Sequence, residues 1–341
     1  MNNQLSLKLR IASFVATLLV VVRHSYTLTA FFPEGGEPMW LNKFEWGTLF
    51  FTDVAVPFFF FVSGFFFIRT DYLSVSQFGR MIQKKGRTLL VPFVIWNLAG
   101  GLVLLMSDNE GNLGDSWQSC LINFLQSKWY GPLWYVRDLM LLMLIGPIYS
   151  WLYQGWRQLI IFAYVIYLVC YDWWPGAVHL LNGEGILFFL LGGLLQKHQS
   201  LLQKHFPYWL SCTLICLWVW CSFNIASFGL SMQDQIQHKL SVAIGIVAFW
   251  VAMDMIPKSW HPYMLKLAPY SFLIYVTHFY IQKAMKVILA YIWPNNEIVA
   301  LVAFLVIPVL LVFAIIVFGK MWQKYLPKMF SICMGGRGIA Q

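Results

Sequence analysis

The sequence predicts an all-α fold, a polytopic membrane helix bundle with about ten transmembrane helices. Hydrophobic residues fill 60% of the 341 positions and charged residues only 11%, whereas globular proteins carry about 25% charged residues. A single soluble core stops growing near roughly 250–300 residues, so a water-soluble domain cannot bury this much apolar side chain. The aromatic share of 18% also suits a chain that crosses membrane interfaces. These observations exclude a soluble enzyme, a disordered protein and a nucleic-acid-binding domain.

Ten apolar segments are long enough, or nearly so, to span about 30 Å of hydrocarbon. In chain order they cover residues 9–30, 46–68, 88–106, 133–153, 157–173, 184–198, 206–227, 238–256, 268–291 and 297–320. The fifth and sixth are the shortest. No small-residue cleavage site follows the first segment, so we expect it to be retained. We expect one transmembrane domain over residues 1–320 and a short cytosolic tail over residues 321–341.

Lysine and arginine residues divide unevenly between the loops that join these segments. With the N-terminus in the cytosol, sixteen of them fall on or near the inner side, and only Lys43, Lys128 and Lys239 fall on the outer side. Inner loops of membrane proteins carry the excess of Lys and Arg. The distribution therefore predicts that both termini are cytosolic, in line with an even number of helices.

Placing an ionisable side chain in lipid is energetically unfavourable, so ionisable residues inside the apolar segments are candidates for a functional site. They are Arg23, His24, Asp53, Arg137, Asp138, His278, Lys283 and Lys286. At 1.5 Å per helical residue, His24 lies about 22 Å from the inner edge and Asp53 about 10 Å below the outer edge. The others also lie towards the outer side. Charges from four segments thus reach the outer half of the bilayer, which predicts a polar cavity open to the outside.

Among these groups His24 is the best suited to act as a base near neutral pH. Asp53 lies at the right depth to orient and charge-balance it. The alternative for Asp53 is a structural ion pair, for example with Arg137. Arg10 lies fourteen residues before His24, which is 40° short of four full helical turns. The two side chains therefore lie on roughly the same face of the helix, about 21 Å apart. The alternative for Arg10 is a simple inside-positive anchor.

A cluster of basic residues precedes the third segment and consists of Arg80, Lys84, Lys85 and Arg87. Such a cluster on the inner side is typical of contact with anionic lipid. It equally suits the binding of a phosphorylated cytosolic cofactor. The two interpretations are compatible.

Six stretches of the chain form a pattern when they are taken in order. They read RIASFVATLLVVVRHS (10–25), AVPFFFFVSGFFF (55–67), KKGRTLLVPFVIWNL (84–98), GPLWYVRDLMLL (131–142), GILFFLLGGLL (185–195) and APYSFLIYVTHFYI (268–281). Together they resemble the integral-membrane acyltransferase family three over nearly the whole chain. The first resembles the family's arginine-to-histidine helix, although thirteen residues separate Arg10 from His24, where the family usually has ten.

The resemblance implies an acyltransferase of the bacterial cytoplasmic (inner) membrane. Such an enzyme moves an acyl group, most often acetyl, from cytosolic acyl-CoA to a hydroxyl of a cell-surface or lipid-linked sugar. Acyl-CoA is then a co-substrate, and we expect no tightly bound cofactor, no metal and no nucleic-acid partner. The rival hypothesis is a transporter of glycan or lipid-linked sugar without acyl-transfer chemistry, which accounts for a polar cavity equally well.

The resemblance also implies roles for particular residues. His24 either deprotonates the sugar hydroxyl or is itself acylated. Asp53 is expected to orient His24, and Arg137 or a lysine to stabilise the oxyanion. The phosphates of coenzyme A are expected to bind Arg10, Lys84, Lys85 and Arg87. The acceptor is expected to contact Trp134, Tyr135, Lys283 and His278. For Trp134 and Tyr135 the alternative is an interfacial aromatic belt.

Overall fold

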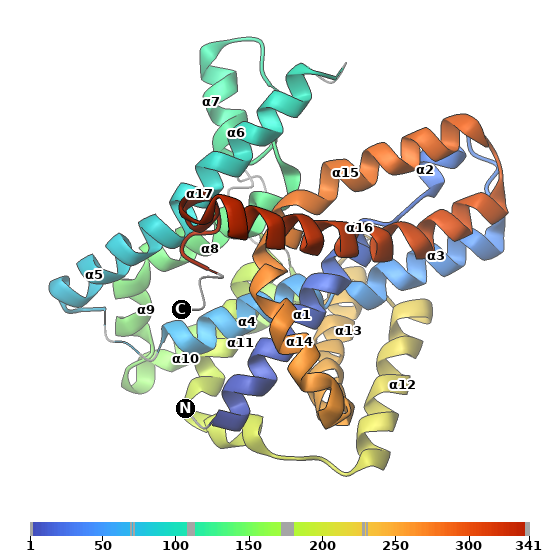
Figure 1. The fold of residues 1–341 in the computed structure, drawn as a ribbon. Helices are drawn as coiled ribbons and strands as arrows, with labels where there is room; N and C mark the ends of the chain where they lie inside the picture. The colour runs from blue at the N-terminus through green and yellow to red at the C-terminus, as the bar shows by residue number, and fades with distance from the viewer. Residues whose placement is uncertain are drawn as a thin grey trace. The chain divides into compact units, whose positions relative to one another are not determined.

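The computed structural model is built of helices, as the composition predicts (Figure 1). It describes residues 3–68, 70, 72–107, 113–171, 181–226, 229 and 231–337, and no β-strand occurs among them. In hydrocarbon each backbone N–H and C=O needs a partner inside the protein, and a helix supplies these partners within one segment. The predicted all-α fold is confirmed.

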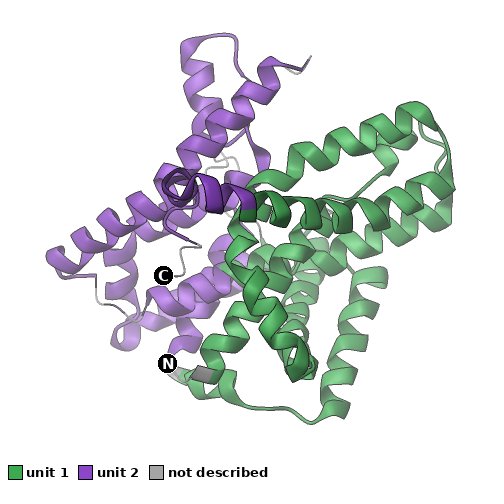
Figure 2. Cartoon of the chain, in the orientation of Figure 1, with its two compact units in different colours: residues 1–59, 169–171, 198–320 green, residues 60–168, 172–197, 321–341 purple. Residues whose placement is uncertain are grey.

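The helices form two compact units, each described by itself (Figure 2). Unit 1 takes residues 1–59, 169–171 and 198–320, and unit 2 takes residues 60–168, 172–197 and 321–341. The main helices of unit 1 are α1 (Asn3–Arg23), α2 (Leu28–Phe31), α3 (Met39–Thr52), α12 (Tyr208–Asn224), α13 (Met232–Ala252), α14 (His261–Leu267) and α15 (Ser271–Ile292).

Unit 2 contains the middle of the chain and its last helix. Its elements are α5 (Val75–Lys85), the π-helical turn η1 (Gly86–Leu90), α6 (Val91–Leu105), α7 (Trp117–Leu125), α8 (Trp134–Leu144), α9 (Gly146–Leu152), most of α10 (Gln158–Cys170), α11 (Gly183–Leu195) and α17 (Pro327–Cys333). Besides α10, the helices α4 (Ala55–Phe67) and α16 (Glu297–Tyr325) contribute residues to both units.

Five helical stretches of the described chain are long and apolar enough to cross a membrane. They are Gln4–Phe31, Met39–Phe67, Val75–Leu105, Met232–Met255 and Glu297–Tyr325. Helices α8 and α9, bent by 60° at the start of α9, make a sixth if they form one span. Shorter apolar helices cover Gly155–Cys170, Gly183–Leu195 and Tyr208–Asn224, and α15 holds the predicted ninth segment. Every predicted segment thus contains a helix, while ten full spans and the sidedness of the termini stay predictions. Residues 172–173 of the fifth segment, residue 227 of the seventh and residues 338–341 of the tail lie outside the described residues.

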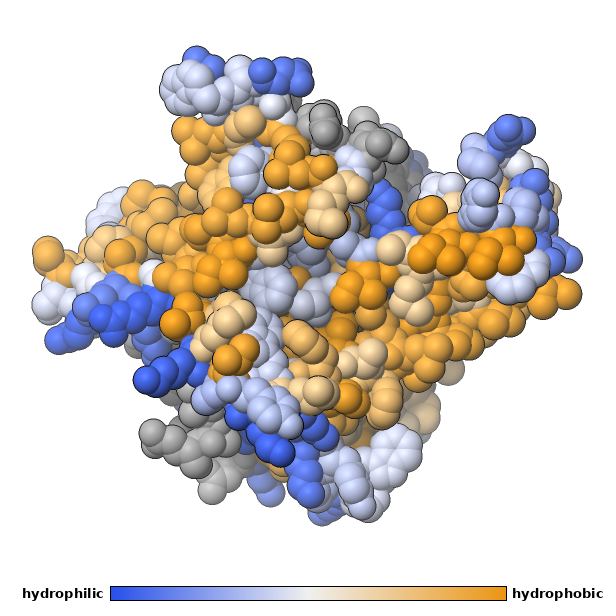
Figure 3. Space-filling view, turned by 45° about the horizontal axis from the view of Figure 1, so that its top comes forward, coloured by the Kyte–Doolittle hydropathy of each residue, from blue (hydrophilic) through white to orange (hydrophobic). Residues whose placement is uncertain are grey.

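Large apolar side chains cover much of the exposed surface (Figure 3). On α16, Val309 and Phe313 are 68% and 69% exposed, and Phe318 is also exposed. A soluble protein does not present such long apolar faces to water, because each exposed patch favours association. The surface and the apolar helices together identify a multi-pass membrane protein.

In unit 1, α1 packs against α3, α14 and α15, and α12 packs against α3 and α13. The contact of α3 with α12 depends on a small residue. A Cβ added at Gly47 would lie 2.2 Å from the Phe223 ring. Nearby, the rings of Phe51 and Trp218 stack with their centroids 4.0 Å apart. This packing fixes α3, which carries Asp53 just beyond its last residue.

In unit 2, glycines bring the second half of α4 against α11. A Cβ at Gly64 would lie 1.9 Å from the backbone oxygen of Phe189, and one at Gly192 would lie 2.0 Å from that of Phe61. Small residues at a helix contact let the backbones of membrane helices approach closely. The Ser-Gly-Phe of the second motif and the Gly-Gly of the fifth therefore have a packing role.

Candidate functional site

The first apolar segment is broken at the candidate catalytic histidine. Helix α1 ends at Arg23, residues 24–27 are non-helical, and α2 begins at Leu28. The apolar segment predicted for residues 9–30 lies within the candidate membrane span Gln4–Phe31, but its helix is interrupted at residues 24–27. The turn after α1 is closed by bonds from the backbone N–H of His24 to Val21 O (3.2 Å) and of Ser25 to Val22 O (2.9 Å). His24 thus lies on a turn.

Two side chains of α15 bind the backbone at the break. Lys286 Nζ donates to the carbonyl oxygens of His24 and Tyr26, at 2.8 Å each. The fully buried Gln282 donates through Nε2 to Val21 O at 3.2 Å and to Ser25 Oγ at 2.9 Å. Non-helical backbone at membrane depth is tolerated only where the protein or trapped water satisfies it. Lys286, predicted as part of a charged cavity, is here a stabiliser of the broken helix.

A carboxyl group of α3 binds the far side of the same break. Glu45 is fully buried, accepts from the backbone N–H of Thr27 at 2.8 Å, and also accepts from the Thr27 hydroxyl. A buried carboxyl group of this kind is stable only when its oxygens find donors. Glu45 and Lys286 hold the four-residue break from two different helices.

The structure brings His24 and His278 together. Their ring centroids lie 5.2 Å apart at an interplanar angle of 45°, and the Phe279 ring meets His24 edge-on at 5.1 Å. His278 is fully buried. Its Nδ1 faces the carbonyl oxygens of Ile274 (3.1 Å) and Tyr275 (2.9 Å), so this nitrogen carries the proton. The other nitrogen, Nε2, is buried and makes no hydrogen bond among the described residues, which leaves a proton acceptor next to His24.

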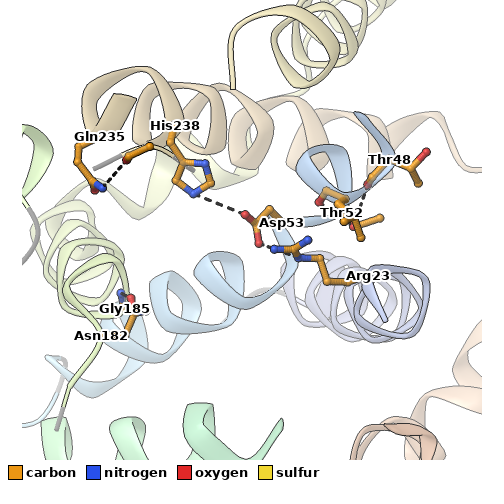
Figure 4. A network of polar contacts seen from close by, with 10 residues as sticks. Arg23, Thr48, Thr52, Asp53, Asn182, Gly185, Gln235 and His238 are labelled. Atoms are coloured by element: carbon orange, nitrogen blue, oxygen red, sulfur yellow. Dashed lines mark hydrogen bonds and ion pairs between the residues drawn. The ribbon is translucent and has the colours of Figure 1, made fainter. Parts of the chain in front are cut away.

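Asp53 lies between two basic side chains other than His24 (Figure 4). Its Oδ1 is 3.1 Å from Nε of Arg23, and its Oδ2 is 3.5 Å from Nε2 of His238. The predicted contact of Asp53 with His24 is thus replaced by a contact with Arg23, the residue directly before it. The sequence did not point to His238, because it begins an apolar segment and reads as an interfacial residue.

Arg137 and its neighbours lie in unit 2. The Arg137 guanidinium pairs with Asp138, through Nε at 2.8 Å and Nη2 at 2.7 Å, and its Nη1 donates to Gln126 O at 2.7 Å. The second oxygen of Asp138 accepts from the backbone N–H of Asn182 at 2.8 Å. Because this network joins the end of α7, α8 and the start of α11, it is the structural ion pair considered for Arg137, with Asp138 in place of Asp53.

The remaining candidates for acceptor binding differ in exposure. Trp134 and Tyr135 are half-buried in unit 2, with ring centroids 6.0 and 4.8 Å from that of Phe60. Lys283 is exposed on α15 in unit 1. The contact with Phe60 favours a packing role for the two aromatic residues. The Lys283 side chain is accessible at the surface of unit 1.

The candidates for donor binding are also divided between the units. Arg10 is exposed on α1 of unit 1, two residues from Lys8, which pairs with Asp254 at 2.7 Å. In unit 2, Lys84 and Arg87 are exposed and Lys85 is half-buried, at the junction of α5 and the π-helical turn. Arg10, Lys84 and Arg87 are therefore accessible to an anion.

Two further features bear on the chemistry of the site. Among the described residues no group of three or more His, Cys, Asp or Glu side chains is arranged to hold a metal ion.

A hollow of about 540 Å³ lies between α15 and α16, but its lining, which includes Met285, Trp293 and Val302, is apolar. It offers no polar group to orient a sugar, so the histidine pair remains the candidate site.

Comparison with known proteins assigns the family. The sequence profile of acyltransferase family three, described as "Acyltransferase domain", matches residues 9–317. The chain is also 25% identical over 173 residues to "Succinoglycan biosynthesis protein ExoH" of Rhizobium meliloti (strain 1021). That match covers 47% of this chain and 46% of the relative, so it spans about half the length of each. No solved structure matches the chain significantly. Since the profile covers nearly all of the sequence, the chain belongs to this acyltransferase family.

Proposed function

We propose that this acyltransferase moves an acyl group, acetyl in the first instance, from cytosolic acyl-CoA to a hydroxyl of a cell-surface or lipid-linked sugar. The glycan acceptor is supported by the relative, whose name refers to succinoglycan biosynthesis. We further propose that the protein spans the bacterial cytoplasmic membrane with both termini inside. One observation supports the proposal most strongly. His24 lies directly after the end of α1, on the stabilised break of the first apolar span, and its ring lies beside that of the buried His278.

In this proposal His24 is the base. Its imidazole takes the proton of the sugar hydroxyl as the hydroxyl oxygen attacks the thioester carbonyl. The carbon–sulfur bond then breaks, and the leaving thiolate of coenzyme A takes up the proton from the imidazolium. A positioned base of this kind contributes roughly 10²–10⁴ in rate. A second route, in which His24 is first acylated and then passes the group on, uses the same ring.

The experiment joins two measurements on one protein. Purified protein in detergent is incubated with acetyl-CoA and with surface glycan from cells that lack it, and released coenzyme A and acylated sugar are both quantified. We expect the two products in equal amounts. Coenzyme A release without acylated sugar, or glycan acylation that is identical in cells with and without the protein, would contradict the proposal.

The same assay separates the two routes. When donor is supplied without acceptor, direct transfer leaves the protein unlabelled, whereas the acyl-enzyme route leaves one acyl group on the protein. Mass spectrometry of the intact protein distinguishes these results.

A further inference from the structure

The stretch after α16 belongs to unit 2, where it packs against α6 and the π-helical turn η1. Helix α17 packs on α6, and the indole Nε1 of Trp96 donates to Cys333 O at 3.0 Å. Two residues further on, Gly335 adopts a φ of +61°. A Cβ on this glycine would lie 2.5 Å from the carbonyl oxygen of Thr88. Glycine is required here both for the left-handed backbone and for the close approach.

This docking places Arg337 over the π-helical turn Gly86–Leu90. Nη1 of Arg337 donates to Thr88 O at 2.8 Å and to Met334 O at 3.2 Å. A π-helical turn departs from the usual i→i+4 ladder and is frequent at functional sites. The half-buried guanidinium is therefore fixed at the turn that follows the basic residues Lys84 and Lys85.

Positive charge accumulates at this turn. The charges of Arg337 and Lys84 both act on the Lys85 ammonium group. No salt bridge within the described residues involves Lys84, Lys85 or Arg87. Bringing like charges together at a partly buried place is unfavourable. Burial also lowers the pKa of the Arg337 guanidinium from its ordinary value, a direction that a bound anion would reverse.

We infer that Arg337 and Lys85 bind a phosphate group, and that this phosphate belongs to the acyl-CoA donor. The inference rests on the proposed function and assigns a donor-binding role to a residue beyond the stretch matched by the family profile, which ends at residue 317. A guanidinium binds phosphate oxygens through a planar pair of N–H donors, and the neighbouring ammonium adds charge. An anionic lipid headgroup presents the same phosphate chemistry, so the experiment separates the two sources.

The test compares two donors that differ in phosphate. Acetyl-CoA carries phosphates, whereas acetyl-pantetheine presents the same thioester without any. The full chain is reconstituted in nanodiscs of neutral phosphatidylcholine, with and without an added anionic lipid, and KM is measured for both donors. For Arg337→Gln we expect KM for acetyl-CoA to rise roughly 10- to 100-fold, the range for losing a hydrogen bond to a charged group, with KM and kcat for acetyl-pantetheine unchanged. Lys328→Gln is the matched control, because Lys328 is exposed on α17, and it should behave as wild type with both donors.

Three results would overturn the inference. An equal loss with both donors means that Arg337 only holds the docked stretch in place. An unchanged KM for acetyl-CoA means that Arg337 does not bind the donor. A loss seen only in nanodiscs that contain anionic lipid assigns the phosphate to a headgroup.

A second variant and the wild type complete the design. Lys85→Gln should show the same split between the donors, so the inference stays testable if Arg337→Gln does not fold. If wild-type protein transfers acyl groups from neither donor, the proposed function fails, and that result is distinct from all of those above.

Discussion

At the scale of single residues, the site depends on which nitrogen of each histidine is available. Since Nδ1 of His278 donates to the carbonyl oxygens of its own helix, only its Nε2 faces the interior as an acceptor. The fixed tautomer gives His24 a neighbour that accepts a proton or an N–H. The sequence named both histidines as candidates. Their contact was not predictable, because it depends on the register between α1 and α15.

Asp53 gives a prediction at this scale. It holds Arg23, the residue before His24, and contacts His238. Asp53→Asn keeps the shape of the side chain but removes the charge between these two basic groups. We expect the factor by which the acyl-transfer rate falls to be about 10 times smaller for Asp53→Asn than for His24→Gln. The reason is that Asp53 acts only through Arg23, on the position of the histidine. His238→Gln should have a smaller effect than Asp53→Asn.

The measurement is kcat for acyl transfer by purified variants at saturating donor. Glu34→Gln is the control for loss of one acidic charge, because Glu34 is exposed. If Asp53→Asn matches wild type, or is as inactive as His24→Gln, the positioning role of Asp53 is wrong.

At the scale of elements, the break in the first helix is the feature that could not be predicted from the sequence. Residues 24–27 read His-Ser-Tyr-Thr, with neither proline nor glycine to interrupt a helix. The break is stabilised instead by Glu45, Gln282 and Lys286, which lie far along the chain on α3 and α15. Local propensity cannot report partners that only the packed bundle supplies, so a continuous helix was the expected result.

Lys286 gives the prediction for this element. Lys286→Met keeps the length of the side chain and removes both of its hydrogen bonds to the backbone of the break. Each hydrogen bond to a charged group is worth about 1.5–3 kcal/mol, so the break should lose its fixed geometry and His24 its position. We expect acyl transfer to fall at least about 10-fold, since small misplacements of a reacting group carry large rate penalties.

The control for this variant is Lys43→Met, because Lys43 is an exposed lysine on α3 of the same unit. Transfer rates and thermal unfolding in detergent are measured side by side. A transfer rate within two-fold of wild type for Lys286→Met would show that the break needs no support from α15.

At the scale of the whole molecule, composition alone was sufficient for the fold class. A chain with 11% charged residues and long apolar runs has to fold as a membrane helix bundle. The function of individual charges was harder to predict. Arg137 and Asp138 are adjacent in sequence, and neighbouring helical residues do not face each other. The structure nevertheless joins them through the long Arg137 side chain, which leaves Arg137 in a structural network.

The predicted topology is tested by reporter fusions. Basic residues concentrate on the loops assigned to the inner side. We therefore expect a reporter inserted after Gly36 to be active outside the cytosol and one fused to the C-terminal end of the chain to be active inside it. Gly36 is exposed and has a positive φ, and an exposed loop tolerates an added domain. Detection of both reporters on the same side would contradict the orientation and, with it, a cytosolic donor site.

The central claim, that His24 carries acyl transfer, is tested most directly by His24→Gln. Glutamine keeps a hydrogen-bonding side chain but cannot exchange a proton near neutral pH. With donor saturating, we expect acceptor acylation by the purified variant to fall by about 10²–10⁴, while expression and membrane insertion stay unchanged. His198→Gln, at an exposed histidine, should retain wild-type activity. Acylation by His24→Gln within a few-fold of wild type would contradict the claim and leave His24 a structural residue of the helix break.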